Sequence, residues 1–262
     1  MKVLVTVKEV GEVGDDFAIE GDGIADGDLE YDINEWDEYA LEAGVRLAEA
    51  EIAEEVVTAT IGPERAEETI RTALAKGADR AVRVFDDAIE DAFLDVETRV
   101  DILEAIVEAE QPDLVLSGVQ ASDTAFGATG VALAERIGYQ HAAVVNDLEM
   151  DADAGVAHVR RELEGGIEEL TEADLPAVLT IQTGLNEPRY ASLRGIRQAQ
   201  RKEIDVRTLS DIGLSEIDVE GKVTLSSMYE PESDSDTELI EGDAGEAAAR
   251  LAEVLREGGV DA

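Results

Sequence analysis

The feature that most constrains the fold is a regular alternation of short apolar segments and longer amphipathic segments over the first 138 residues. Four runs rich in apolar and β-branched residues have the pattern of buried strands, at 2–8, 55–62, 80–85 and 113–118. Helical periodicity follows each run, at 35–51, 63–79, 96–111 and 125–138. Such alternation is typical of a parallel sheet covered by helices. We therefore predict the α/β class, with a doubly wound and mostly parallel sheet.

Local signals mark several boundaries between these segments. Residues 9–33 are rich in Gly and Asp and are expected to form a hairpin or a loop. Asn34 is expected to cap the first helix, because its side chain can accept from a free N–H of the first turn. Pro63 fits the first turn of the second helix, and Gly77 fits its end.

The pattern changes in the second half of the chain. Three segments separated by Gly/Asp turns predict antiparallel strands, at 142–150, 155–163 and 165–173. Residues 175–183 return as a core strand, 229–242 form a polar linker, and Asp243 predicts a capping box at the start of a last helix. We expect a nucleotide-binding domain at 1–215 and a C-terminal arm at 216–262 that wraps a partner.

The net charge indicates the solvent in which the chain works. Sixty-three acidic residues against 21 basic ones give a formal charge of −42, and the acids are spread over every segment. Such self-repulsion loosens a compact fold in ordinary salt, whereas at molar salt the screening length shrinks to about 3 Å. We therefore expect a cytoplasmic protein of a salt-accumulating extreme halophile. The alternative, an acidic disordered chain, conflicts with the strong apolar periodicity.

Several function classes find no support in the sequence. A nucleic-acid partner requires a basic face, which this composition does not provide. No apolar run approaches 18 residues, and the first ten residues look like a strand rather than a signal peptide, so direct membrane insertion is not expected. Cysteine is absent, and neither His141 nor His158 has a persuasive serine partner. We expect no catalytic residues and no metal site.

The best candidate for a ligand site is the segment SGVQASDTAFGATG at 117–130, between a strand and a helix. In a parallel sheet this connection lies at the carboxyl edge, where nucleotides bind. Gly127 and Gly130 let the backbone approach a ligand, Thr129 adds a hydroxyl, and the helix N-terminus offers N–H groups to a phosphate. A Gly/Ala-rich turn that merely packs tightly is an equal alternative, because the segment matches neither G-x-G-x-x-G nor a P-loop.

Four segments, in order along the chain, carry motifs of a known family. NEWDEYALEAGVRLAE is similar to an Asn-Pro-Phe-Asp-Glu helix start, and GPERAEETIRTALAKGADRAVRV is similar to a Gly-Pro…Gly-Ala-Asp-Arg block. GVQASDTAFGATG is similar to a Gly-x-Gln-Ala-x-Asp loop, and LPAVLTIQTGLNEPRYASLRGI to a signature that ends in Asn-Glu-Pro-Arg-Tyr. Together they resemble the β subunits of electron transfer flavoproteins, from residue 2 to about residue 215.

The resemblance implies a heterodimer. In that family the β subunit folds as a doubly wound domain of the adenine nucleotide alpha hydrolase-like type, usually holds a structural AMP, and takes part in no covalent chemistry. The partner α subunit carries the redox FAD, which accepts electrons from flavin dehydrogenases of the acyl-CoA type, in fatty acid oxidation, and passes them to a quinone oxidoreductase. The nucleotide contacts implied by the family motifs are Thr6, Val7, Asn34, Ile61, Gly62, Asp123, Thr124, Gly127, Ala128, Thr129 and Gly130.

Two alternatives remain open. Some family members bind a second FAD at the nucleotide site and bifurcate electrons from NADH, with Val-Pro-Asp after the first strand and Asp-Gly-Asp-Thr-Ala-Gln in the loop. This chain has EVGEVGDD and SDTAFGA there, which weakens the bifurcating alternative. The family also often has Asn and Gln at Gly127 and Ala128, so two side-chain contacts to the nucleotide are missing. The other alternative is a nucleotide-binding regulatory module without flavin, which has no need of an exposed Arg-rich segment.

The scarce positive charge is concentrated in LNEPRYASLRGIRQAQRKEI at 185–204, where five Arg/Lys lie within fourteen residues. In the family this segment is the recognition loop that docks on dehydrogenases. The residues that the resemblance assigns to partner binding are Arg189, Tyr190, Leu193, Arg194 and Arg197. Leu193 is the expected apolar anchor and Arg189 is expected to face the flavin region of the α subunit. The alternative is a helix whose Leu193 and Ile196 face the core; the resemblance favours the loop.

Overall fold

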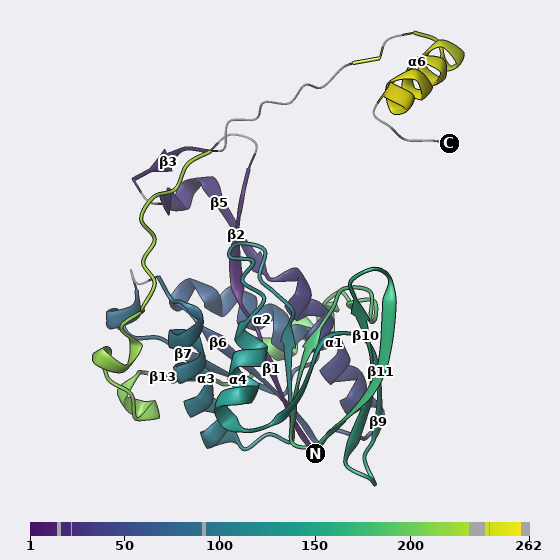
Figure 1. The fold of residues 1–262 in the computed structure, drawn as a ribbon. Helices are drawn as coiled ribbons and strands as arrows, with labels where there is room; N and C mark the ends of the chain where they lie inside the picture. The colour runs from purple at the N-terminus through teal and green to yellow at the C-terminus, as the bar shows by residue number, and fades with distance from the viewer. Residues whose placement is uncertain (15–16, 22, 91–92, 231–238, 241, 258–262) are drawn as a thin grey trace. The chain divides into compact units, whose positions relative to one another are not determined.

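A computed structural model describes residues 1–14, 17–21, 23–90, 93–230, 239–240 and 242–257. The chain forms two units, Met1–Met228 and Tyr229–Ala262, which are described separately. The first unit contains a nine-stranded sheet in the order β11-β10-β9-β12-β8-β1-β6-β7-β13, with helices against it (Figure 1).

Most of this sheet is parallel. The parallel strands are β1 (Lys2–Thr6), β6 (Glu55–Ile61), β7 (Arg80–Val84), β8 (Leu114–Gly118), β9 (Gln140–Asp151), β12 (Ala177–Ile181) and β13 (Ile204–Arg207). β10 (Val156–Leu163) and β11 (Ile167–Asp174) continue the sheet from β9 as antiparallel strands. The predicted α/β class, with a mostly parallel sheet and added antiparallel strands, is therefore confirmed.

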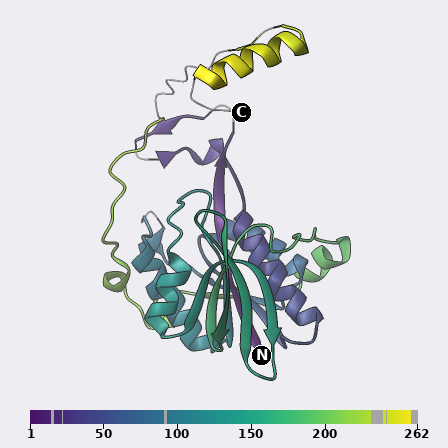
Figure 2. The ribbon, with the colours of Figure 1, turned by 45° about the vertical axis from the view of Figure 1, so that its right-hand side comes forward.

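Helices cover both faces of the sheet, as Figures 1 and 2 show. The four that follow strands are α1 (Glu35–Glu49), α2 (Glu67–Lys76), α3 (Val96–Glu110) and α4 (Thr129–Ile137). Val3 of β1 and Leu41 of α1 belong to one buried cluster, whereas Leu4 and Ile102 of α3 belong to a second. Successive side chains of a strand point to opposite faces, so β1 contributes to both cores. This arrangement explains why its sequence is apolar without interruption.

The fourth helix begins later than its periodicity predicts. The expected helix at 125–138 starts only at Thr129. Ala125 has a φ of 48° and Gly127 a φ of 60°, and both values lie in the left-handed region, which takes the chain off the helical path. Residues 125–128 are thereby a loop at the carboxyl edge of the sheet.

The Gly/Asp-rich segment before α1 forms the expected hairpin. β2 (Glu9–Val13) pairs antiparallel with β5 (Leu29–Ile33), and the short strands β3 (Ile19–Glu20) and β4 (Gly23–Ile24) pair with each other. Arg65, just before α2, holds this hairpin against the rest of the first unit. Its Nε lies 2.9 Å from a carboxylate oxygen of Glu9, and its guanidinium stacks 4.2 Å from the centre of the Tyr31 ring.

The chain stays attached to the first unit well beyond residue 215. The 3₁₀ helix η5 (Glu216–Val219) buries Val219 in the α3 core cluster. The Asp95 carboxylate, at the start of α3, accepts hydrogen bonds from the backbone N–H groups of Lys222 and Val223 at 2.7 and 3.1 Å. We propose that the separate C-terminal arm begins after these contacts.

The second unit contains α6 (Ala244–Glu257). The predicted capping box is confirmed: Asp243 Oδ1 accepts from the N–H of Glu246 at 2.9 Å, and Glu246 Oε2 accepts from the N–H of Asp243 at 3.2 Å. Leu251 and Leu255 of α6 are about half exposed, at 49% and 45%. The polar linker predicted at 229–242 falls mostly outside the described residues.

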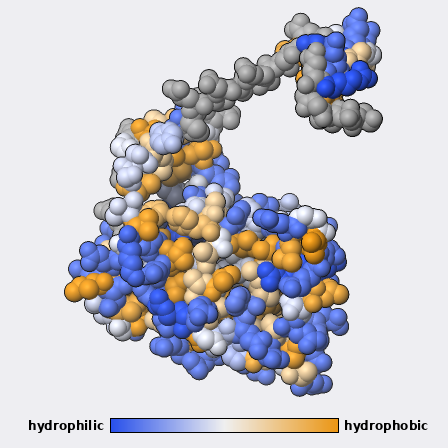
Figure 3. Space-filling model, in the orientation of Figure 1, coloured by the Kyte–Doolittle hydropathy of each residue, from blue (hydrophilic) through white to orange (hydrophobic). Residues whose placement is uncertain are grey.

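The surface agrees with the composition. On the face drawn in Figure 3, hydrophilic residues cover much of the first unit, and hydrophobic residues lie between them in separate groups. Within the described residues, none of the helices is both long and apolar enough to cross a membrane.

Candidate functional site

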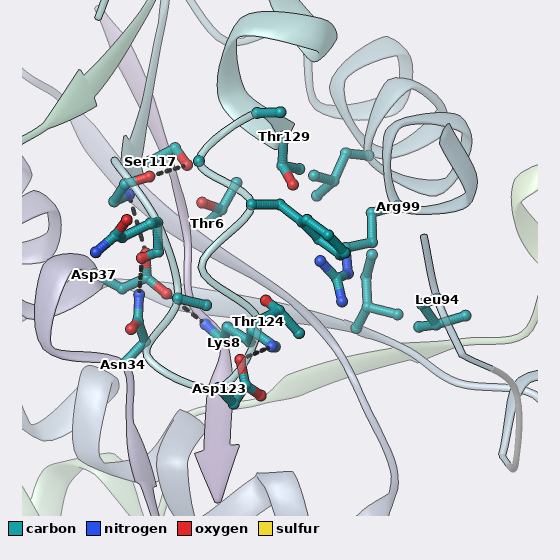
Figure 4. Close-up of a pocket in the computed structure, with 18 of the residues that line it drawn as sticks. Thr6, Lys8, Asn34, Asp37, Leu94, Arg99, Ser117, Asp123, Thr124 and Thr129 are labelled. Atoms are coloured by element: carbon teal, nitrogen blue, oxygen red, sulfur yellow. Dashed lines mark hydrogen bonds and ion pairs between the residues drawn. The ribbon is translucent and has the colours of Figure 1, made fainter. Parts of the chain in front are cut away.

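A cavity of about 300 Å³ lies where the carboxyl ends of β1, β6 and β8 meet (Figure 4). Nine residues expected from the family motifs line it: Thr6, Val7, Asn34, Ile61, Asp123, Thr124, Gly127, Ala128 and Thr129. They come from four separate segments, which the parallel topology brings to one edge of the sheet. The cavity is at the lower end of the size range of small-molecule sites, which suits one nucleotide.

Gly62 and Gly130 lie outside the cavity lining, and close packing explains both glycines. A Cβ at Gly130 would lie 2.6 Å from Cγ2 of Thr180, so α4 can approach β12 only without a side chain there. A Cβ at Gly62 would lie 3.2 Å from Cβ of Ala66. The tight-packing alternative for the glycine-rich segment therefore applies to Gly130.

Asn34 holds the loop of the cavity and does not cap α1 with its side chain. It occupies the N-cap position, yet no side-chain cap bond forms. Its Nδ2 donates to the Gln120 carbonyl at 2.8 Å, and its Oδ1 accepts from the Ser122 N–H at 3.3 Å. The expected cap was therefore wrong, because the side chain bonds more distant backbone in preference to its own helix.

Asp37, which the sequence did not single out, joins three elements behind the cavity. Its buried carboxylate accepts from the Lys8 N–H at 2.8 Å and from the Gly118 N–H at 3.0 Å. Burial raises the pKa of Asp37 to about 6, although these hydrogen bonds and the Lys8 charge act in the opposite direction. Gly118 has no room for a side chain, because a Cβ would lie 2.6 Å from Cβ of Trp36. The ends of β1, β8 and α1 are thereby fixed at one point.

Two cations face the cavity, and sequence reasoning missed both. Lys8 forms an ion pair with Asp123 of the loop. Arg99 reaches the cavity from the first turn of α3. Burial lowers the pKa of each, and the attraction of Asp123 acts against this effect in both cases. No local motif marks either residue, since their roles depend on tertiary placement.

The loop before α4 and the first residue of α4 line the cavity. The N–H of Ala125 bonds the carbonyl of Ala121 at 2.8 Å, which forms a tight turn. The N-cap residue of α4, Ala128, provides no side-chain acceptor within the described structure. The first N–H groups of α4 therefore lack a side-chain partner, and the partial positive charge of the helix end favours an anion there.

Part of the cavity wall is apolar. Phe93 and Phe126 meet edge to face with their ring centres 6.2 Å apart, and Ile61, Leu94 and Leu103 continue this wall. Phe126 is still 50% exposed, as expected for an aromatic side chain at the mouth of a site. The lining thus combines two cations, a helix N-terminus and apolar side chains, which together match a phosphate and a purine ring.

The Arg-rich segment forms a second candidate region, which we call the α5 segment (186–202). It contains the helix α5 (Leu193–Ala199), capped by Ser192 Oγ, which accepts from the Gly195 N–H at 3.0 Å. Leu193 is 78% exposed and Tyr190 is 96% exposed. The expected loop is therefore a loop followed by a short helix, and the alternative in which Leu193 packs in the core is wrong.

Arg189 forms ion pairs with other residues of this chain. Its guanidinium pairs with the carboxylates of Glu42 at 2.7 Å and Glu49 at 2.6 Å, both on α1. Glu42 is 4% exposed, and burial tends to raise its pKa, but Arg189 and Arg46 together hold the pKa below its usual value. Arg194 and Arg197, by contrast, are exposed on α5. Arg189 thus attaches the α5 segment to α1.

The other end of the α5 segment is attached to α2. Nη1 of Arg71 donates to the carbonyls of Ala199 and Lys202 at 2.8 and 2.6 Å. A Cβ at Gly195 would lie 2.3 Å from the Ala75 carbonyl oxygen, so only glycine permits this approach. The α5 segment is therefore attached to α1 and to α2, and it exposes Leu193 between these attachments. Within the described residues, no group of three His, Cys, Asp or Glu side chains could hold a metal ion.

Comparison with known proteins places these features in a family. The family model of the electron transfer flavoprotein domain matches residues 23–212. The chain is 46% identical to an electron transfer flavoprotein subunit beta of Methylophilus methylotrophus over 98% of both chains. It is 36% identical to the mitochondrial subunit beta of Arabidopsis thaliana, over 88% of this chain and 90% of that relative. It is 35% identical to the subunit beta of Homo sapiens, over 88% of this chain and 89% of that relative. This chain belongs to the family of electron transfer flavoprotein β subunits.

Proposed function

We propose that this chain pairs with an α subunit that carries FAD, and that it holds a structural AMP in the cavity at the carboxyl edge of the sheet. The observation that supports AMP is the cavity itself, whose lining combines an uncapped helix end, two cations and an aromatic wall. A volume of about 300 Å³ accommodates a mononucleotide. The FAD supplies all the redox chemistry, and this chain contributes binding and docking.

The α5 segment is the proposed docking surface for flavin dehydrogenases of the acyl-CoA type. Leu193 is its apolar anchor, since it is exposed and carried by a helix attached at both ends. Arg194 and Arg197 beside it provide charges that pair with an acidic partner. A quinone oxidoreductase is the proposed electron acceptor, as the family resemblance implies.

The composition supports a salt-rich cytoplasm as the setting. The charge of −42 is spread along the chain, and only five of the 21 basic residues are lysines. In molar salt, steering by surface arginines is strongly screened. We therefore propose that apolar contact through Leu193 contributes more to docking than the arginines do.

Electron transfer from an acyl-CoA dehydrogenase to the purified heterodimer tests the docking proposal. Leu193→Ala removes the anchor, and the rate at limiting heterodimer is expected to fall about tenfold or more, as for a hot-spot residue. Leu170→Ala is the matched control, because Leu170 on β11 is 81% exposed and lies on another part of the sheet. Equal rates for the two variants would show that docking does not use Leu193.

A further inference from the structure

Arg99 is a cavity residue to which none of the family motifs gives a role. It is the fourth residue of α3, and Figure 4 shows its side chain extending into the cavity toward the loop that carries Thr124. A cation in the first turn of a helix is opposed by the helix dipole. Stability of α3 therefore does not explain an arginine at this position.

The carboxylates near Arg99 already have other partners. Asp123 is paired with Lys8. Asp95 accepts from the N–H groups of Thr98, Lys222 and Val223. Their charges attract Arg99 from a distance, yet its guanidinium makes no hydrogen bond or ion pair with any residue that the structure describes. Its five N–H donors are therefore open to a ligand.

The surroundings of Arg99 favour an anionic ligand. Lys8 and Arg99 are both largely removed from water, and the charge of Arg99 lowers the pKa of Lys8 further. An unpaired cation in such a place costs free energy that an anionic ligand offsets. Lys8 has a direct partner in Asp123, whereas Asp123 and Asp95 act on Arg99 only from a distance. Among the described residues Arg99 is therefore the cavity cation without a direct ion-pair partner.

We infer that Arg99 is a phosphate-binding residue of this cavity, and that it makes the site select a nucleoside phosphate over the nucleoside. The inference rests on the proposed AMP site and assigns its phosphate end. The N-terminus of α4 lines the same cavity through Thr129, so backbone donors and the guanidinium converge on one phosphate. A guanidinium matches two phosphate oxygens at once, which an ammonium does not.

The experiment measures equilibrium binding of AMP and of adenosine to the heterodimer after its nucleotide has been removed. Arg99→Gln is expected to weaken AMP binding about tenfold to a hundredfold, because it removes charge-assisted hydrogen bonds, and to change adenosine binding by less than about twofold. Arg99→Lys is expected to recover part of the loss. Arg136→Gln is the matched control, since Arg136 lies on α4 and pairs with Asp101 and Glu104 away from the cavity.

The outcomes separate this inference from the function on which it rests. Equal weakening of AMP and adenosine, or no change in either, would overturn the role of Arg99 while leaving the AMP site intact. If the unmodified heterodimer binds neither ligand, the proposed AMP site is wrong and the inference falls with it. Thermal unfolding of each variant checks that the fold is retained, and Arg99→Lys keeps the comparison possible if Arg99→Gln does not fold.

Discussion

Replacement of Arg189 by alanine tests how the α5 segment is held. Arg189 forms paired contacts with Glu42 and with Glu49, and Nε of Arg46 holds the other side of Glu42 at 2.6 Å. The Glu42 side chain is 4% exposed, whereas that of Glu49 is 60% exposed. Nearly all of the stabilisation should therefore come from Glu42, because exposed ion pairs contribute little.

The size of the effect follows from this partial burial. Removing one partner of a buried ion pair costs about 3–5 kcal/mol, since the remaining charge stays desolvated. Arg46 still pairs with Glu42 in the variant, and the Arg189 side chain is 30% exposed, so about 2 kcal/mol is expected. For a unit of this size that corresponds to a fall of roughly 4–8 °C in the Tm.

The effect should also depend on pH. The pKa of Glu42 is lowered in the folded protein below its ordinary value, so the stabilisation by Arg189 is present above the ordinary value and is lost as pH falls through the lowered pKa. Thermal unfolding at fixed molar salt, at pH 7 and below pH 4, measures both predictions. Arg194→Ala is the control, since Arg194 is exposed on the same segment. A Tm for Arg189→Ala that equals the control at pH 7 would refute the attachment.

Three further predictions follow from the structure. The pKa of Asp37 is raised to about 6, so the free energy of unfolding of the wild type falls as pH rises through that value. Asp37→Asn should remove this pH dependence, which amounts to about 3 kcal/mol between pH 4 and 6, and chemical unfolding across this range would detect it. Gly130→Ala should lower the free energy of unfolding by about 1–3 kcal/mol through contact with Thr180, measured by denaturant titration, whereas no change would contradict the packing role. Lowering the salt from molar to about 0.1 M should lower the Tm of the wild type because a charge of −42 is less screened; a Tm independent of salt would contradict that reading of the composition.

The main sheet was predictable because its strands are short, apolar and separated by clear helical periods. The antiparallel extension was predictable for the same reason, from alternation and Gly/Asp turns at 142–173. The start of α4 was not, because the small residues of AFGATG fit a helix or a loop equally well. The left-handed conformations of Ala125 and Gly127 arise from the tertiary path of the loop.

The site was predictable where family motifs contribute to it and not elsewhere. Asp37 follows the motif asparagine closely, yet among 63 acidic residues a single carboxylate carries no signal. Arg99 lies on a helix with ordinary amphipathic periodicity, and its place in the cavity comes from the packing of α3. The Arg189 contacts join residues 140 or more positions apart, which no local pattern reveals.

The nucleotide content of the purified heterodimer tests the central claim most directly. The chain would be co-expressed with its α subunit at high salt, the complex denatured, and the released FAD and AMP quantified. The proposed function predicts one FAD and one AMP per heterodimer. Two FAD and no AMP would contradict it in favour of a bifurcating subunit, and a chain that forms no flavin-containing pair would contradict the proposed role as a subunit of an electron carrier.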